Sequence, residues 1–182
     1  MYPLKTARLR IEPLRPDHAP KVVEALGDTR LYTYLPDDPP SLESLQRRYD
    51  FLANGRSPDG EEQWLNWIVF LVDSETPVGT FQATLPKGKE GAFAYMVFPP
   101  FWRQGYAREM AICVIDHLFA TQNLPGLFAE IDTRNLASIR LAESLGLTHV
   151  ATTRDADVFK GSTSDEYTYS VSSAAWQRIH HE

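Results

Sequence analysis

The 182 residues carry a formal net charge of −6; 43% of them are hydrophobic and 23% are charged. A chain of this length can bury a core without help from a metal or a disulfide, so we expect residues 1–182 to form a single domain. The negative balance argues against a nucleic-acid-binding surface, which normally shows clustered Lys and Arg. It is compatible with a cationic substrate, although a mild acidic excess is also common in cytosolic proteins.

The single cysteine and the hydropathy pattern give no sign of export or membrane insertion. Cys113 lies in an apolar helical pattern, which indicates a small buried hydrophobic residue rather than a nucleophile. Residues 1–14 lack the sustained apolar core of a signal peptide, and the apolar run 67–72 is much too short to span a bilayer. We therefore expect a cytoplasmic protein without a membrane partner.

The first part of the chain predicts one strand followed by two helices. Apolar and polar residues alternate over 7–14, as in a strand with one wet face. A helix that ends at Gly27 follows. After a proline-rich loop, the second predicted helix covers 41–55, with Ser41 as its N-cap.

The central part predicts three antiparallel strands joined by short turns. The first, 63–72, has apolar residues at consecutive positions, which is typical of a central strand covered on both faces. The other two lie at 78–85 and 92–98. Trp64 and Trp67, both in the first of these strands, are expected in the core.

The last part predicts helices and strands in alternation. A broad apolar stripe indicates a buried helix over 107–120. The elements after it are a strand at 127–132, a helix at 136–145, two strands at 148–158 and 165–171, and a short helix capped by Ser172. We interpret His180 and His181 as a solvated tail, and we expect no metal site.

A glycine stands just before the helix 107–120, in the segment Arg103-Gln104-Gly105-Tyr106-Ala107. A helix N-terminus leaves about four backbone N–H groups without intrahelical partners, and the helix dipole adds partial positive charge there. Gly105 lets the preceding loop curl tightly, and the small Ala107 allows a ligand to approach. The segment predicts a phosphate or diphosphate site, with a plain turn as the alternative. The glycine patterns of Rossmann and P-loop proteins do not occur.

A second polar pair opens the helix 136–145. Asn135 and Ser138 are three residues apart, so both side chains lie near one end and on one face of that helix. Capping accounts for either residue alone. Two strand-to-helix junctions in series, the first suited to a diphosphate and the second to amide groups, indicate one elongated ligand that contacts both.

These two segments resemble the GCN5-related N-acetyltransferases (the GNAT superfamily), and within them the RimJ/RimL-like group that acetylates ribosomal-protein N-termini. The acetyl-CoA motif of the family, Gln/Arg-x-x-Gly-x-Gly/Ala, is matched within Trp102 to Met110. The downstream pattern of Asn-x-x-Ser and a Glu-x-x-Gly-Phe-like end is matched by Asn135, Ser138, Glu143, Gly146 and Leu147. The order of elements is similar over nearly the whole chain.

The resemblance implies a GNAT fold of the α/β (α+β) class. Its central sheet would be mixed, mostly antiparallel and about seven-stranded, flanked by helices and splayed between the fourth and fifth strands, 92–98 and 127–132. Acetyl-CoA, as the cosubstrate, would lie in that opening, with its pantetheine paired to the backbone of Met96, Val97 and Phe98. The other cofactor-binding residues implied are Arg103, Gln104, Gly105, Tyr106, Ala107 and Arg108 for the diphosphate, Asn135 for the pantetheine and Ser138 near the sulfur.

The chain departs from the family pattern at three positions. Arg103 replaces a common glycine; an arginine there can add charge to a phosphate site or face solvent. Ala142 stands where many relatives have the tyrosine that protonates the departing thiolate. Ala92 stands near the position where relatives often carry a catalytic glutamate. Other residues must therefore take over both proton transfers.

Ser138 and Glu130 are the expected catalytic residues. The resemblance implies direct transfer to a neutral amine in a ternary complex, with backbone N–H groups of the splayed strand stabilising the oxyanion. Ser138 is the nearest hydroxyl to the thiolate in the family frame. Glu130 and Asp132 share one face of their strand and are the candidates for the base, with a solvated or structural role as the alternative. Tyr95 is a further candidate, with core packing as its alternative.

The acceptor implied is a primary amine, either a peptide or protein N-terminus or a small molecule such as an antibiotic or an amino acid. The residues expected to receive it are Tyr32, Tyr34, Asp37, Asp38 and Asp155 or Asp157, with solvated loop side chains as the alternative. A non-catalytic acyl-CoA-binding regulatory domain on the same fold is the alternative from a different class. We expect a monomer or a homodimer with no nucleic-acid partner.

Overall fold

The computed structural model describes residues 2–181. An eight-stranded sheet has the order β1-β2-β3-β4-β5-β6-β8-β7. Its strands are Leu4–Lys5 (β1), Leu9–Pro13 (β2), Glu62–Leu71 (β3), Pro77–Pro86 (β4), Gly91–Val97 (β5), Gly126–Asp132 (β6), Thr148–Phe159 (β7) and Ser162–Ser172 (β8). Neighbouring strands are antiparallel except for β5 and β6, which are parallel. The mixed, mostly antiparallel sheet is therefore confirmed, and the two-residue β1 is an addition to it.

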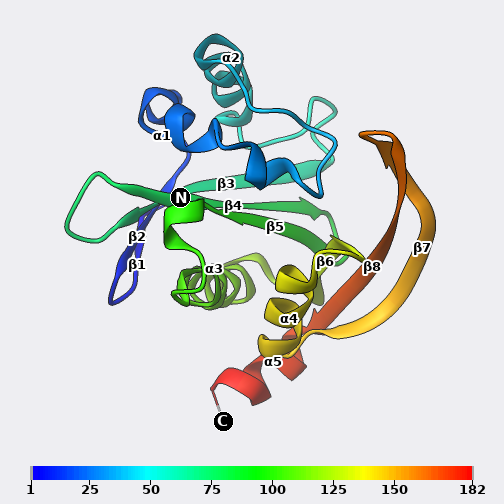
Figure 1. The fold of residues 1–182 in the computed structure, drawn as a ribbon. Coiled ribbons are helices and arrows are strands. Elements are labelled where there is room, and N and C mark those ends of the chain that lie inside the picture. Colours follow the sequence, from blue (N-terminus) through cyan, green and yellow to red (C-terminus); the bar gives the residue numbers. More distant parts are fainter. Residues whose placement is uncertain (1, 182) are drawn as a thin grey trace.

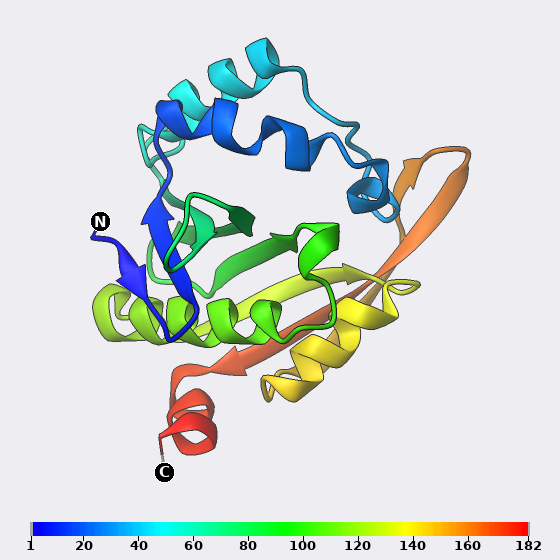
Figure 2. The same cartoon turned by 60° about the vertical axis from the view of Figure 1, so that its left-hand side comes forward.

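Helices cover both faces of the sheet (Figure 1). One face carries Ala19–Leu26 (α1) and Leu42–Leu52 (α2), with the 3-10 helices Pro16–His18 (η1) and Thr29–Tyr32 (η2). The other face carries Tyr106–Gln122 (α3), Leu136–Ser144 (α4) and Ser173–His180 (α5), and the turned view separates the two layers (Figure 2). A third 3-10 helix, Pro99–Phe101 (η3), links β5 to α3. None of the helices between residues 2 and 181 is long and apolar enough to cross a membrane.

The apolar sequence of β3 places it inside the molecule. Trp67, Ile68, Val69 and Phe70 are fully buried, because successive side chains of a strand point to opposite faces and both faces are covered here. Trp67 and Val69 belong to the core that contains α3, whereas Ile68 and Phe70 pack with α1 and α2. The predicted double coverage is confirmed. Trp64, nearer the start of the strand, is half-buried rather than in the core.

β5 and β6 are joined at one end only. Their register pairs are Gly91 with Leu127 and Ala92 with Phe128, and no other pair links these two strands within the described chain. Beyond Ala92 the strands diverge, as Figure 1 shows. The opening expected between these strands is confirmed.

His180 is half-buried and packed, which corrects the expectation of a solvated tail for this residue, whereas His181 is exposed but hydrogen-bonded. His180 Nε2 lies 3.0 Å from the carbonyl oxygen of Leu145, and the His180 ring lies 3.9 Å from the ring of Trp176. His181 Nε2 lies 2.8 Å from Asp116 Oδ1. Trp176 is fully buried and anchors α5, so the helix carries both histidines onto the body of the protein. Their partners are distant in sequence, which is why local patterns did not indicate them.

His18 is completely buried where η1 meets α1. Its Nδ1 accepts a hydrogen bond from the backbone N–H of Arg15 at 3.2 Å, and its Nε2 lies 3.1 Å from Glu12 Oε2. These contacts suit the neutral ring with its hydrogen on Nε2. Burial, reinforced by the positive charge of Arg15, lowers the pKa of His18 from 6.5 to about 4.

We expect the free energy of unfolding to decrease as the pH falls from 6.5 to about 4. The unfolded chain binds a proton on His18 near pH 6.5, whereas the folded protein binds it only near pH 4, so protonation favours the unfolded state in this interval. At about 1.4 kcal/mol per pKa unit, the contribution lost is on the order of 3 kcal/mol. Denaturant unfolding at a series of pH values measures it.

His18→Asn keeps a hydrogen-bond acceptor but does not titrate, so it should flatten this part of the pH dependence. The exposed His149→Gln is the matched control and should keep the wild-type slope. If His18→Asn keeps the wild-type slope, as the control variant should, His18 is not the source of this pH dependence.

Candidate functional site

The edge of β5 that faces the opening carries backbone groups without a neighbouring strand. The N–H of Phe98 donates to the carbonyl of Val78 at 2.8 Å, on the β4 side. Because hydrogen-bonding direction alternates along a strand, Met96 also turns toward β4, whereas Tyr95 and Val97 turn toward the opening. Of the three residues expected to pair with a ligand through their backbone, Met96, Val97 and Phe98, only Val97 faces the opening. Tyr95 faces the opening as well.

The loop before α3 curls through two left-handed residues. Arg103 has φ 61°, and Gly105, the N-cap of α3, has φ 81°. Within residues 2–181, no hydrogen bond uses the backbone N–H groups of residues 103–108. Free donors at the positive end of a helix dipole are the groups that a diphosphate requires. The segment therefore has the features of an anion site.

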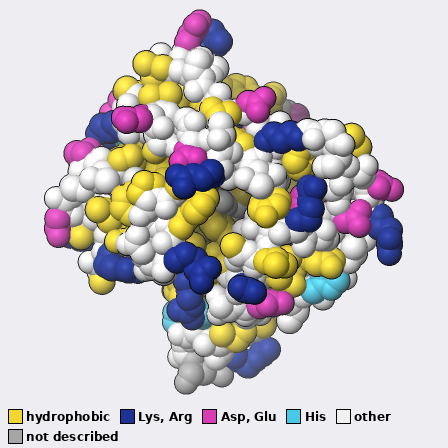
Figure 3. All heavy atoms as spheres, viewed as in Figure 1, with side chains coloured by type: hydrophobic (Ala, Val, Ile, Leu, Met, Phe, Trp, Pro, Cys, Tyr) yellow, Lys and Arg dark blue, Asp and Glu magenta, His cyan; other side chains and the backbone are white. Residues whose placement is uncertain are grey.

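The surface around the start of α3 is polar and positively charged. The side chains of Arg103, Gln104 and Arg108 are exposed, and Gln104 Nε2 donates to the carbonyl of Pro100 at 2.8 Å. Figure 3 shows a hollow in the middle of this face with Lys and Arg side chains at its border. An anion bound to the backbone donors would thus lie in a favourable potential.

Arg8 holds the start of α3, and sequence analysis missed it. Arg8 Nη1 donates to the carbonyl of Gln104 at 3.0 Å, and Arg8 Nε donates to Glu109 Oε2 at 2.6 Å. The guanidinium also lies 4.3 Å from the centre of the Tyr106 ring. Burial alone would raise the pKa of Glu109, but hydrogen bonds from Thr6 and Arg8 outweigh it and lower the pKa. No local pattern signals a contact between residues 101 positions apart.

Trp102 fastens the same loop to the end of β5. Its Nε1 donates to the carbonyl of Val97 at 2.6 Å. On its other side, the guanidinium of Arg30 lies 5.5 Å from the centre of the indole ring. The loop that carries the free amides is therefore attached to both β5 and the η2 segment.

Tyr95 and Ser138 meet across the opening between β5 and β6. Tyr95 Oη donates to Ser138 Oγ at 3.1 Å. Because Ser138 Oγ is the acceptor in this bond, its own hydrogen stays available for another acceptor. Asn135 Oδ1 accepts the backbone N–H of Ser138 at 3.1 Å and thereby caps α4. Burial raises the pKa of Tyr95, against the opposing effect of its bond to Ser138, and keeps the phenol protonated. Tyr95 therefore does more than pack in the core.

A cavity of about 140 Å³ occupies this opening. Ser138 and Tyr95 line it together with two carboxylates, Glu130 of β6 and Glu166 of β8. Burial raises the pKa of Glu166, and the negative charges of Glu130 and then Asp157 raise it further. Glu166 was not singled out from the sequence, because β8 becomes a neighbour of β6 only through the register of the folded sheet.

Asp132 lines the same cavity but is occupied by structural contacts. Arg134 Nη2 donates to Asp132 Oδ2 at 2.6 Å, and Ser164 Oγ donates to the same oxygen at 2.7 Å. The bond from Arg134, helped by the one from Ser164, lowers the pKa of Asp132 to about 2. Asp132 is therefore too weak a base for an amine proton, which corrects its place beside Glu130 as a candidate.

A second cavity, of about 240 Å³, lies between the sheet and helices α1 and α2. It adjoins the first, because Leu35, Ala94 and Tyr95 line both. The expected acceptor residues divide between them: Tyr32, Asp37 and Asp38 line the second cavity and Tyr34 lines the first. Asp155 and Asp157 line neither cavity, so their expected contact with the acceptor stays a prediction.

The tip of the β7–β8 hairpin closes one side of this region. Lys160 Nζ donates to the carbonyl oxygens of Tyr32 and, at 3.4 Å, Asp37. The hairpin tip and the segment after η2 accordingly lie side by side in both ribbon views (Figures 1 and 2). Tyr32 Oη is itself engaged, since it donates to the carbonyl of Leu26 at 2.9 Å. In the described part of the chain, no three His, Cys, Asp or Glu side chains are grouped so that they could hold a metal ion.

Known proteins share this architecture. Residues 8–148 match the family model described as an acetyltransferase (GNAT) domain. The uncharacterized N-acetyltransferase YoaA of Bacillus subtilis is 24% identical over 174 residues, which cover 94% of this chain and 97% of that protein.

Two solved structures illustrate the likeness in fold. Spermidine N-acetyltransferase from Vibrio cholerae, in complex with CoA and spermine, has a TM-score of 0.79 at 15% identity, with 94% of this chain and 99% of that chain covered. The Salmonella typhimurium acetyltransferase that modifies the N-terminal serine of 50S ribosomal subunit protein L7/L12 has a TM-score of 0.78 at 16% identity, with 92% and 96% covered. Identities this low establish the shared fold alone.

Gly105→Ala should weaken coenzyme A binding by roughly tenfold, which corresponds to about 1.4 kcal/mol. Alanine is strained at φ 81°, so the loop should shift away from its donor geometry, although the added methyl would make only an ordinary contact with Arg8 Nη2 at 3.4 Å. The strain should also reduce stability by about 1 to 2 kcal/mol. Calorimetric titration with CoA and denaturant unfolding measure the two effects.

Gly88→Ala is the matched control. Gly88 has φ 68° with no atom within 4 Å of an added methyl, and it lies in the β4–β5 turn. It should lose a similar amount of stability and keep the wild-type affinity for CoA. Equal CoA affinities in the two variants would refute the placement of the diphosphate at Gly105.

Proposed function

The chain belongs to the GNAT acetyltransferase family and uses acetyl-CoA as its cosubstrate, and from this premise we propose that it transfers the acetyl group directly to a primary amine while both reactants are bound. The observation that carries the proposal is the pair of cavities that adjoin at Tyr95. One lies between β5 and β6 and the other between the sheet and α1 and α2, so two reactants can enter from different sides and meet. Such positioning supplies much of the acceleration of a two-substrate reaction.

The residues that would hold acetyl-CoA suit its polar parts. The cosubstrate supplies an acetyl group that is activated as a thioester. The free amides of residues 103–108 would bind the diphosphate, and the open edge of β5 at Val97 and Tyr95 would pair with the pantetheine. Asn135 uses its Oδ1 to cap α4, so its Nδ2 is left to donate to a pantetheine carbonyl.

Ser138 and Tyr95 would together deliver the proton to the leaving sulfur. Tyr95 Oη donates to Ser138 Oγ, which leaves the hydroxyl hydrogen of Ser138 free to point into the cavity. When Ser138 Oγ gives up this proton, Tyr95 Oη can replace it along the existing hydrogen bond. This pair fills the role for which Ala142 has no suitable side chain.

Glu130 and Glu166 would deal with the proton of the amine. Both line the cavity that contains Ser138. Glu166 is the better acceptor, because burial and the charge of Glu130 raise its pKa toward the range in which a general base works at neutral pH. Glu130, the base expected from the sequence, would then act mainly through its charge on Glu166.

The acceptor would be the primary amine of a small molecule or of a short peptide end. The RimJ/RimL-like pair Asn135 and Ser138 supports a peptide N-terminus, whereas the side closed by Lys160 supports a compact acceptor. The rival from another class, a non-catalytic acyl-CoA-binding domain, does not account for the paired hydroxyl groups of Tyr95 and Ser138. Thiol release from acetyl-CoA, screened over amines, polyamines, amino acids and short peptides, separates the two. Tight binding of acetyl-CoA without release for any amine would favour the binding domain.

Ser138→Ala should lower kcat by about 10- to 100-fold and leave the affinity for acetyl-CoA nearly unchanged, because proton transfer is lost while the amides of residues 103–108 stay in place. Thiol-release kinetics and calorimetric titration measure the two quantities. Ser144→Ala removes a hydroxyl from the same helix, where Ser144 Oγ only donates to the carbonyl of Leu141, and should keep the wild-type rate. A wild-type rate in Ser138→Ala would rule out the role of Ser138.

Glu130→Gln should move the acidic limb of the kcat/KM profile to lower pH. The negative charge of Glu130 raises the pKa of Glu166, so its removal lowers that pKa and keeps Glu166 deprotonated in more acidic solution. Glu166→Gln should abolish the limb and lower kcat/KM by about 100-fold. Glu43→Gln, on the exposed surface of α2, is the control and should leave the profile unchanged. The assignment fails if neither cavity variant alters the limb.

A further inference from the structure

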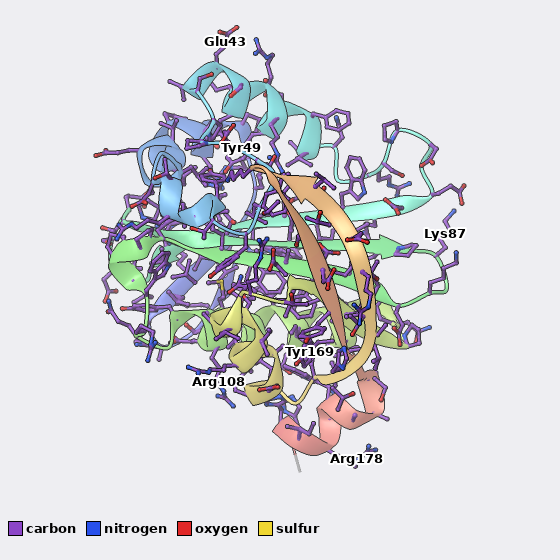
Figure 4. All side chains as sticks on the ribbon, turned by 45° about the vertical axis from the view of Figure 1, so that its right-hand side comes forward. Glu43, Tyr49, Lys87, Arg108, Tyr169 and Arg178 are labelled. Carbon is purple, nitrogen blue, oxygen red and sulfur yellow. The ribbon has the colours of Figure 1, made fainter. Side chains whose placement is uncertain are left out.

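Several polar side chains that line the cavity between the sheet and α1 and α2 have no hydrogen-bond partner in the described chain, and three of them are uncharged and come from three different elements. Tyr49 comes from α2, Asn66 from β3 and Gln82 from β4. Tyr49 is 4% exposed and Asn66 is 9% exposed, so both are more than nine-tenths buried, whereas Gln82 is exposed to solvent. No hydrogen bond within the described chain involves the side chain of any of the three. Figure 4 shows Tyr49 on the side of α2 that faces the sheet.

The strand register places the two amides side by side. Asn66 pairs with Gln82, and Gln82 pairs with Ala94, so the three residues form one row across β3, β4 and β5. Cross-strand partners point to the same face, and this face is the one that Ile68 of the next row turns toward α1 and α2. The row therefore forms the floor of the cavity and ends at Ala94, beside Tyr95, where the acetyl-transfer site begins.

Unpartnered buried polar groups destabilise a protein unless a ligand or water satisfies them. Among the described residues, Trp67 Nε1 is the only fully buried side-chain nitrogen or oxygen without a partner, and it belongs to the core on the opposite face of β3. Tyr49, Asn66 and Gln82 differ because a cavity lies directly in front of them. Their hydrogen-bonding groups are thus placed for a molecule that enters from outside.

The charged side chains around the cavity are exposed, unlike Tyr49 and Asn66. Asp37, Asp38 and Arg48 also line the cavity, but all three side chains are exposed to solvent at its mouth. The carboxylates Glu130 and Glu166 line the adjoining cavity instead. The buried part of the floor, Tyr49 and Asn66, has no charged side chain buried beside it, and burying an unpaired charge is far more costly than burying an amide or a hydroxyl.

We propose that Tyr49, Asn66 and Gln82 bind an uncharged hydrogen-bonding group of the acceptor, an amide, carbonyl or hydroxyl, while the amine of the same molecule lies beside Tyr95. This inference rests on the proposed acetyl transfer and names the substrate class. Neighbouring strands are about 4.8 Å apart, so Gln82 and Asn66 lie roughly 5 and 10 Å from β5. The acceptor therefore carries its neutral polar group at about this distance from its amine.

Three probes of equal length test the proposal: 4-aminobutanamide, 4-aminobutanoate and 1,4-diaminobutane. They differ only in whether the end opposite the amine is neutral, anionic or cationic. Thiol release from acetyl-CoA by the full chain gives kcat/KM for each. We expect the amide to exceed both charged probes by at least about tenfold. A preference for either charged probe overturns the proposal.

Substitutions of the floor residues test whether these residues cause the preference for the amide. Asn66→Leu, Gln82→Leu and Tyr49→Phe should each lower kcat/KM for 4-aminobutanamide by about three- to tenfold, since each removes one hydrogen bond to the neutral group. Values for the charged probes should change less than twofold. Gln46→Leu, at an exposed position of α2, is the matched control and should behave as the wild type. Unchanged amide kinetics in all three floor variants also overturn the proposal.

Thermal unfolding without ligand gives a readout that is independent of activity. If Asn66 and Tyr49 serve a ligand and not the fold, Asn66→Leu and Tyr49→Phe should melt at or above the wild-type temperature. A lower melting temperature in both would assign them a structural role and reject the proposal.

Failure of the proposed function stays distinguishable from failure of this inference. If no probe and no other amine releases thiol, acetyl transfer is refuted. Binding of 4-aminobutanamide to the CoA-loaded protein then tests whether the floor holds a neutral group. A rise in melting temperature with 4-aminobutanamide that is lost in Asn66→Leu supports the floor as a neutral-group site. No rise in the wild type rejects it.

Discussion

β5 and β6 part after two register pairs, and this separation creates most of what the site needs. A parallel neighbour along the whole of β5 would consume the backbone groups of Tyr95 and Val97. Because the strands diverge, no neighbouring strand uses these groups, although Trp102 Nε1 donates to the carbonyl of Val97, and a cavity forms between the strands. β6 remains paired with β8 along its full length, so its backbone stays hydrogen-bonded on that side where the sheet opens. The same divergence leaves space in which the hydroxyl of Ser138 meets that of Tyr95.

The second requirement is that donors be held in place before a ligand arrives. Free amides at the start of α3 are useful only if the loop does not collapse onto them, and here remote side chains prevent this. Arg8 and Thr6 hold Glu109 inside the first turn of α3, and Trp102 fastens the loop to β5. Donors that are fixed in advance need no reorganisation when negative charge binds.

The two cavities differ in electrostatic character although they adjoin. Carboxylates line the one between β5 and β6, where the proposed acetyl transfer has the amine lose its proton. Neutral hydroxyl and amide groups form the floor of the other. Tyr49 and Asn66 are buried residues whose side chains have no hydrogen-bond partner in the described chain, and polar positions that do not serve the fold are typical of sites shaped by function. The contrast separates the chemistry of transfer from recognition of the rest of the acceptor.

Local patterns in the sequence determined the order of helices and strands, the buried central strand, the tight turn at Gly105 and the cap at Asn135, because these depend on residues close together in the chain. The resemblance carried by the two motif segments indicated the cosubstrate and the opening in the sheet. Only the tertiary structure decided that Arg8 supports α3, that Asp132 is hydrogen-bonded by Arg134 and Ser164, and that Glu166 joins Glu130. It also decided that Asn66 and Gln82 share one row. Strand register and helix packing bring these residues together across long stretches of chain, and no local periodicity encodes such a juxtaposition.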